Sequence, residues 1–265
     1  CLYLWWWIKL MAIQQMFLGI PSASAGSPTY ETSQLVTNLD AGDSSTWNGS
    51  ILQDQVGSSD CTFSGGGYSY TTDYGGGIRF NYNNNDDANW DGGLFATPNI
   101  EQTQQTWELW TNMTHGGNLA GVYTYLVHNN SVSTSTGASH MTIGINSSNN
   151  YYAAMDGTYS SMDSGVSGAW YNSNGNSSNY HIVLVWDGQW QKMYVNGSMV
   201  VQHEVGAVIP QNFDSNTAIG ANSFVQSGSY REAAGTFYSL RIYAAALTTA
   251  QVQSNFNGNK AKFGL

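Results

Sequence analysis

The stretch YHIVLVWDGQWQKMYVNGSMVV, residues 180–201, decides the fold. Apolar and β-branched residues fill three short runs, and the pairs Asp187-Gly188 and Asn196-Gly197 separate them. Asp-Gly and Asn-Gly tolerate the positive φ angles of the tight turns that match the twist of a β-sheet. The sequence therefore predicts an antiparallel meander of three strands, at residues 180–186, 189–195 and 198–201.

Short strand patterns continue on both sides of this meander, and one stretch shows clear alternation. In residues 105–111, Trp107 and Leu109 alternate with Glu108 and Trp110, which is typical of a strand with one apolar face. The other expected strands are residues 35–39, 77–80, 122–127, 141–145 and 235–243.

One helix is expected, after the last strand. Thr248 and Gln251 have the spacing of a capping box, and Val252 and Phe256 lie one turn apart on the same helical face. Gly258 is expected to end the helix. These signals together predict an all-β protein, an antiparallel β-sandwich with one short C-terminal helix.

Residues 180–201 and 235–257 resemble the laminin-G-like domains, which have the concanavalin A-like jelly-roll fold. In that family a Tyr-Val-Asn-Gly hairpin comes before a closing strand and helix, which correspond here to Met193–Gly197 and Leu240–Val252. The resemblance spans residues 30–260 and implies a jelly-roll sandwich.

The chain departs from this family pattern at one position. Many members carry an Asp shortly before Arg-Ile-Tyr, where this chain has Tyr238 and Ser239, so no role of that acid is carried over. The expected organisation is an N-terminal leader, arm and linker at residues 1–29, followed by one laminin-G-like jelly-roll domain at residues 30–265.

The N-terminal leader has four open interpretations. They are a transmembrane helix, which Lys9 interrupts; a signal peptide ending near Ala25; a lipidated Cys1; and a reading frame extended upstream of a true start at Met11, which we favour. From Met11, the run MAIQQMFLGIP resembles the N-terminus of many structural and appendage proteins of marine tailed phages. The resemblance implies that residues 11–27 form an arm that docks onto other virion subunits.

The composition excludes one class of partner and indicates an environment. Charged residues make up 9% of the chain, and its 7 Lys and Arg give a formal net charge of −10. Because a phosphate backbone is bound by clustered cations, no nucleic-acid partner is expected. An acidic surface rich in Gly, Asn and Ser favours a protein that is exposed outside cells. Of the two cysteines, Cys61 is expected to be a small buried apolar residue.

The acidic residues do not form a recognisable catalytic pair. A retaining glycosidase needs two carboxylates about 5–5.5 Å apart. None of the five Glu residues lies two or four positions from another acid, as it would on one face of a strand. For lyase chemistry His181, Tyr194, Arg231 and Arg241 are available, but isolated residues of these types are usually structural. We therefore expect that the protein is not an enzyme.

A metal-binding pattern occurs in a segment rich in Asn and Asp. Residues 87–92 match Asp-x-Asn-x-Asp-Gly, in which alternate side-chain oxygens converge on one hard cation. The sequence thus predicts a Ca²⁺ site formed by Asp87, Asn89 and Asp91. An EF-hand is excluded because Pro98 stands at the twelfth position. The alternative is a solvated turn around Trp90.

Two loops combine aromatic rings with amide side chains, as glycan-binding loops do. The candidate glycan-binding residues are Trp90, Trp170, Tyr171 and Asn172. Sugars stack on aromatic faces and form hydrogen bonds with Asn side chains. The alternative is that these rings fill the core, as most Trp and Tyr in a sandwich do.

The sequence as a whole predicts a non-enzymatic structural protein of a virion surface. We expect a fibre, appendage or decoration subunit that forms a homo-oligomer and binds host or environmental glycans. Two alternatives remain open: a secreted or cell-surface lectin-like carbohydrate-binding module, and a polysaccharide-active enzyme. A mature N-terminus at Gly26 would favour the first, and turnover abolished by changing an acid such as Glu108 would establish the second.

Overall fold

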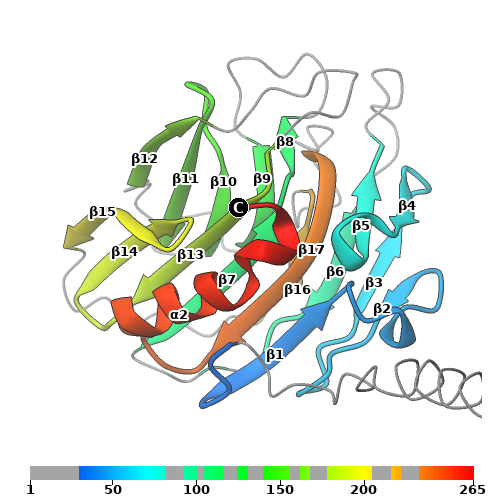
Figure 1. Cartoon of the computed structure of the whole chain (residues 1–265), viewed down its shortest axis with the longest axis horizontal. Coiled ribbons are helices and arrows are strands. Elements are labelled where there is room, and N and C mark those ends of the chain that lie inside the picture. Colours follow the sequence, from blue (N-terminus) through cyan, green and yellow to red (C-terminus); the bar gives the residue numbers. More distant parts are fainter. Residues whose placement is uncertain are drawn as a thin grey trace, which may run out of the picture.

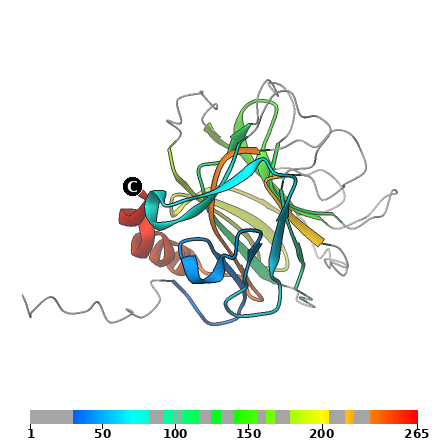
Figure 2. The same cartoon turned by 90° about the vertical axis from the view of Figure 1, so that its right-hand side faces the viewer.

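The strands form two antiparallel sheets that pack face to face (Figures 1 and 2). The computed structural model describes residues 30–81, 92–98, 100, 104–115, 124–130, 140–155, 162–167, 178–204, 216–221 and 233–265. Within these ranges the expected fold class is confirmed, since the molecule is a β-sandwich with one short C-terminal α-helix.

Sheet A contains nine of the described strands. Seven follow the order β15-β14-β13-β7-β17-β5-β4, and β1 and β8 also pair with β17. Their bounds are β1 Leu35–Asp40, β4 Tyr68–Thr71, β5 Gly77–Phe80, β7 Gln105–Thr111, β8 Thr114–His115, β13 Tyr180–Trp186, β14 Trp190–Val195, β15 Ser198–Glu204 and β17 Ala233–Tyr243.

Sheet B contains eight of the described strands, in the order β12-β11-β10-β9-β16-β6-β3-β2. Their bounds are β2 Ile51–Leu52, β3 Cys61–Ser64, β6 Gly92–Ala96, β9 Thr124–Asn130, β10 His140–Ile145, β11 Asn150–Met155, β12 Met162–Ser167 and β16 Asn216–Ile219. Short 3-10 turns occupy Ser44–Thr46, Asp73–Gly75 and Lys260–Phe263.

The predicted meander is present as β13, β14 and β15. Both turns have the expected left-handed backbone, with φ values of 96° at Gly188, 50° at Asn196 and 75° at Gly197. The Asp187 side chain fixes the first turn by accepting hydrogen bonds from the backbone N–H groups of Gln189 and Trp190, at 3.1 and 2.8 Å. Local turn chemistry thus fixes where the chain reverses between these strands, and a β-bulge between Met193 and Tyr194 then shifts the register of β14 on β15.

The core lies between the two sheets and follows the alternation of side chains along each strand. In β7, Trp107 and Leu109 point into it and are at most 1% exposed. Glu108 and Trp110 point to the opposite face, as predicted, yet they are buried as well. Both faces of sheet A are therefore covered.

Cys61 of β3 is a free thiol inside the core, and burial raises its pKa.

The helix α2, Thr249–Asn259, begins at the predicted capping box. The hydroxyl of Thr248 accepts the backbone N–H of Gln251 at 3.3 Å, and the Gln251 side chain accepts the backbone N–H of Thr248 at 2.9 Å. In this way two unpaired N–H groups of the first turn are satisfied. Within the described ranges, no helix is both long and apolar enough to cross a membrane.

The predicted end of this helix at Gly258 is wrong. The helix includes Gly258 and continues into a 3-10 turn at Lys260–Phe263, and the left-handed Gly264, with φ 71°, ends it. The physical reason is tertiary packing, because the Phe263 ring stacks on Trp110 with ring centroids 4.3 Å apart. That contact holds an additional turn that local sequence signals do not predict.

Candidate functional site

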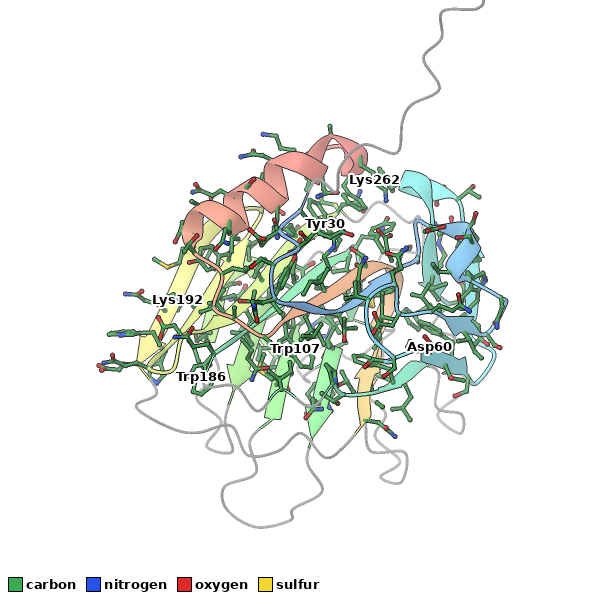
Figure 3. All side chains as sticks on the ribbon, turned by 90° about the horizontal axis from the view of Figure 1, so that it is seen from below. Tyr30, Asp60, Trp107, Trp186, Lys192 and Lys262 are labelled. Atoms are coloured by element: carbon green, nitrogen blue, oxygen red, sulfur yellow. The ribbon has the colours of Figure 1, made fainter. Side chains whose placement is uncertain are left out.

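The two outer faces of the sandwich differ in what lies over them. Helix α2 lies on sheet A, where the Tyr194 hydroxyl hydrogen-bonds to Thr249 at 2.9 Å and Trp110 stacks on Phe256. Figure 3 shows the helix along this side, with the labelled Lys262 beside it. In the part of the chain that the structure describes, α2 is the one α-helix, so none from that part covers sheet B.

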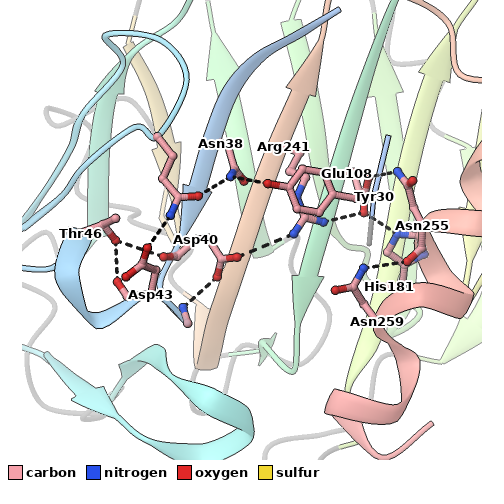
Figure 4. A network of polar contacts seen from close by, with 12 residues as sticks. Tyr30, Asn38, Asp40, Asp43, Thr46, Glu108, His181, Arg241, Asn255 and Asn259 are labelled. Carbon is pink, nitrogen blue, oxygen red and sulfur yellow. Dashed lines mark hydrogen bonds and ion pairs between the residues drawn. The ribbon is translucent and has the colours of Figure 1, made fainter. Parts of the chain in front are cut away.

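A carboxylate is enclosed between sheet A and α2 (Figure 4). Glu108 Oε1 accepts a hydrogen bond from Arg241 Nη1 at 3.0 Å and lies 3.1 Å from His181 Nε2. Glu108 Oε2 accepts from the Tyr243 hydroxyl at 3.0 Å and from Asn255 Nδ2 at 2.6 Å. Because these partners come from β13, β17 and α2, the carboxylate joins the sheet to the helix.

The electrostatics of this network keep Glu108 charged. Burial raises the pKa of Glu108, but Arg241, His181 and Asn255 outweigh that effect and lower the pKa to about 2. The Arg241 guanidinium is itself stacked on the Tyr30 ring, at 3.8 Å from the ring centroid. Glu108 is 1% exposed, and both of its oxygens already accept hydrogen bonds from the protein, so the carboxylate has no unpaired oxygen to offer a ligand. We therefore assign this network to holding α2 on the sheet.

A β-bulge in β9 places two rings on the outer face of sheet B. Ile143 pairs with Val127 while Gly144 pairs with Tyr125, which leaves Leu126 as the extra residue. Leu126 and Val127 both belong to the core. Tyr125 and His128, on either side of them, therefore share the outer face, with ring centroids 4.2 Å apart.

Neighbouring strands extend this surface across sheet B. The register places Thr142 beside His128 and Tyr152 beside Gly144. The Tyr152 ring lies over Gly144, since a Cβ at that glycine would be 2.6 Å from Tyr152 Cε1. The missing side chain at Gly144 therefore makes room for the ring, as glycines in strands often do.

We call Tyr125, His128, Thr142 and Tyr152 the sheet B cluster. Tyr125 is partly exposed, whereas the other three are at most 4% exposed. Among the described residues, the buried Thr142 hydroxyl has no hydrogen-bond partner, and buried polar groups are rarely left in that state. Aromatic rings beside an unpaired hydroxyl suit a ligand that presents both apolar faces and hydrogen-bonding groups.

Comparison with known protein families identifies the superfamily of this chain. A family model matches residues 87–253, more than half of the chain, and its description is the concanavalin A-like lectin/glucanases superfamily. The chain belongs to this superfamily. The match confirms the concanavalin A-like part of the resemblance seen in the sequence, but it does not test the resemblance of the leader to phage proteins. No curated protein matches the sequence.

Solved structures share this concanavalin A-like fold at low sequence identity. Trypanosoma rangeli sialidase in complex with 2,3-difluorosialic acid is 16% identical with a TM-score of 0.63, and the match covers 92% of this chain and 36% of the sialidase. The binding domain of botulinum neurotoxin serotype D/C is 14% identical with a TM-score of 0.59, and the match covers 84% of this chain and 52% of that one. The chain thus spans about a third of the sialidase length, and the likeness shows the fold alone.

These neighbours correct the expectation that the protein is not an enzyme. Because about a third of the sialidase chain has this fold, the fold occurs within glycoside-active enzymes, and the expectation of a non-enzyme is not supported. The expectation depended on the missing pair of carboxylates. Some glycoside hydrolases, the sialidases among them, use a tyrosine nucleophile, so the absence of that pair does not by itself exclude glycoside chemistry.

The binding residues singled out in the sequence lie outside the described residues. They are Asp87, Asn89 and Asp91 for calcium, and Trp90, Trp170, Tyr171 and Asn172 for glycans. Residues 11–27, the expected docking arm, lie outside them too. In the ranges that the structure does describe, no three His, Cys, Asp or Glu side chains are grouped to hold a metal ion. The calcium site and the glycan contacts in those loops therefore stay predictions.

Strict strand alternation does not predict the sheet B cluster of this concanavalin A-like sandwich. Tyr125 and His128 are three positions apart, which would place them on opposite faces of a regular strand. The bulge at Leu126 adds one residue to the strand and so brings both rings to the same face. The available signal was Gly144 within an apolar run, because an isolated glycine in a strand often marks a bulge or a close approach.

Proposed function

We propose that this protein binds carbohydrate on the outer face of sheet B, at the sheet B cluster. The observation that carries the proposal is the partly exposed Tyr125 ring beside His128, next to the buried Thr142 hydroxyl that has no partner among the described residues. Sugar rings combine apolar C–H faces with hydroxyl groups. An aromatic face and a hydroxyl are complementary to those two features.

The comparisons support this proposal at the level of the fold. The superfamily description names lectins and glucanases, and one fold neighbour is a sialidase in complex with a sialic acid derivative. Those properties belong to the other proteins. For this chain, the proposal of carbohydrate binding depends on the residues of the sheet B cluster. Fold alone does not decide function, because one sandwich carries many different sites.

The decisive experiment measures glycan binding by the full chain and by Tyr125→Ala. Glycan arrays identify a bound sugar, and calorimetry then compares the two proteins. Removing the exposed ring should weaken binding at least tenfold, which corresponds to about 1.4 kcal/mol. Tyr74→Ala is the matched control, because Tyr74 is 46% exposed but lies on the sheet A side, where its ring contacts Tyr238 of β17. Equal affinities of wild type and Tyr125→Ala would overturn the proposal.

The same ring pair favours a second candidate function, cleavage of the bound polysaccharide. Histidine and tyrosine are both used as general acids and bases, and here their ring centroids lie 4.2 Å apart. The test is release of reducing ends from polysaccharides that bind. For an enzyme, His128→Gln should lower the rate of release far more than it lowers glycan affinity. No release by the wild type would restrict the function to binding.

Location on a virion surface is a further part of this proposal. Its support is the resemblance of residues 11–21 to the N-termini of phage structural proteins, together with the low-charge composition of the chain. Docking through residues 11–27, calcium binding and homo-oligomer formation are proposals of the same kind. Immunogold electron microscopy of particles and cells tests the location, and labelling confined to cells would overturn it in favour of a secreted or cell-surface module.

A further inference from the structure

The positive charges of the described residues all lie on one side of the sandwich. Each of the five belongs to a strand of sheet A or to the 3-10 turn that follows α2. They are Arg79 in β5, Lys192 in β14, Arg241 in β17, and Lys260 and Lys262 in the turn. The other two cations of the chain, Lys9 and Arg231, lie outside the described residues.

The described strands of sheet B carry no positive charge and a single negative one. In the described strands of sheet B, Asp163 is the one Asp, Glu, Lys or Arg residue. Asp163 pairs across the strands with Tyr152, so it lies on the face of the sheet B cluster. The only fixed charge next to the cluster, within those strands, is therefore negative.

Hydrogen bonds keep this carboxylate charged. Asp163 accepts the backbone N–H of Gly165 at 2.8 Å and the side-chain amides of Asn146 and Asn150 at 2.9 and 3.2 Å. Burial raises the pKa of Asp163, but these donors outweigh it and hold the pKa below its usual range. A carboxylate on a bound sugar would meet a like charge here.

Acidic sugars need a different kind of site. Proteins recognise a ligand carboxylate with the guanidinium of Arg or the ammonium of Lys, often through paired charge-assisted hydrogen bonds. The described part of sheet B supplies tyrosine, histidine, threonine and an aspartate instead. We infer that the sheet B cluster takes an uncharged glycan and discriminates against sugars that carry a carboxylate, such as sialic acids and uronates. This inference rests on the function proposed above.

Glycan pairs that differ only in the carboxylate test the inference directly. Cello-oligosaccharides and β-1,4-manno-oligosaccharides are compared with their C6-oxidised counterparts, together with neutral and sialylated glycans on an array. The full chain is used at low ionic strength, where charge effects are least screened. Each neutral glycan that binds should bind at least tenfold more tightly than its acidic counterpart, and Tyr125→Ala should lose that binding.

The outcomes separate the inference from the proposed function. Equal or tighter binding of the acidic counterparts would overturn the inference but leave carbohydrate binding in place. Binding of neither kind would overturn the proposed function. Neutral binding that survives in Tyr125→Ala would overturn both assignments to the sheet B cluster.

Asp163→Asn tests whether this carboxylate contributes to the discrimination. The variant keeps the size of the side chain and removes the charge. It should raise affinity for the acidic counterparts about two- to fivefold, the effect of one screened charge pair near the surface, and leave neutral glycans unchanged. Asp73→Asn is the control, since that exposed acid pairs with Arg79 on the sheet A side. The same affinities in wild type and Asp163→Asn would overturn the role of the Asp163 charge.

Discussion

Glu108 is a buried carboxylate whose surroundings leave it charged, with Arg241, His181, Tyr243 and Asn255 as direct partners. Glu108→Gln removes the charge and leaves the Arg241 guanidinium buried without its main counter-charge. Breaking one side of a buried pair in this way lowers stability by about 3–5 kcal/mol. The measurement is the free energy of unfolding in urea at pH 7.

A surface glutamate provides the matched control for that substitution. Glu204 is exposed and accepts a hydrogen bond from Gln189 Nε2 at 2.6 Å. Glu204→Gln should change the free energy of unfolding by about 0.5 kcal/mol or less. A loss in Glu108→Gln no larger than this would contradict the assignment of Glu108 to holding α2. Folded Glu108→Gln should still bind glycan, because the sheet B cluster is on the other face.

At the scale of elements, the bulge between β9 and β10 sets the geometry of the sheet B cluster. A Cβ at Gly144 would meet the Thr124 carbonyl oxygen and lie 2.6 Å from the Tyr152 ring. Gly144→Ala therefore overpacks the strand pair and should destabilise the protein by roughly 1–3 kcal/mol. It should also weaken glycan binding, since Tyr152 has to move. Urea unfolding and calorimetry measure the two effects.

The control for this element is Thr62→Ala, at an exposed position of β3 in the same sheet. Its stability and its glycan affinity should stay near those of the wild type. A Gly144→Ala protein with full glycan affinity would show that the ring over Gly144 does not contribute to the site.

Local signals explain which elements could be predicted. The hairpins at Asp187-Gly188 and Asn196-Gly197 and the capping box at Thr248 depend on residues within four positions, and the structure confirms them. The continuation past Gly258 depends on contacts with a distant strand, so local signals end the helix too early. The bulge at Leu126 depends on pairing with another strand, and strict alternation therefore misassigns the face of one ring.

At the scale of the whole molecule, the sequence predicts the sandwich but not what each outer face contains. His181, Arg241 and Asn255 are 73, 133 and 147 positions from Glu108, so no local pattern brings them together. Glu108 could be named as an acid in the sequence, but its enclosure beneath α2 requires the fold. The same holds for the charge difference between the two sheets, since it appears only once the strands have been assigned to sheets.

The buried carboxylate also predicts how the stability of the whole molecule depends on pH. Its pKa of about 2 in the folded protein is below the value of about 4.3 for an unpaired Glu, so folding favours the charged form. That contribution, about 3 kcal/mol, is complete above the unfolded pKa and is lost as the pH falls from about 5 to 2. Other acids titrate in the same range, so the useful quantity is the difference in unfolding free energy between wild type and Glu108→Gln. Urea unfolding from pH 7 to pH 2 should show this difference shrinking below pH 5. A difference that stays constant down to pH 2 would contradict a charged Glu108 in the folded protein.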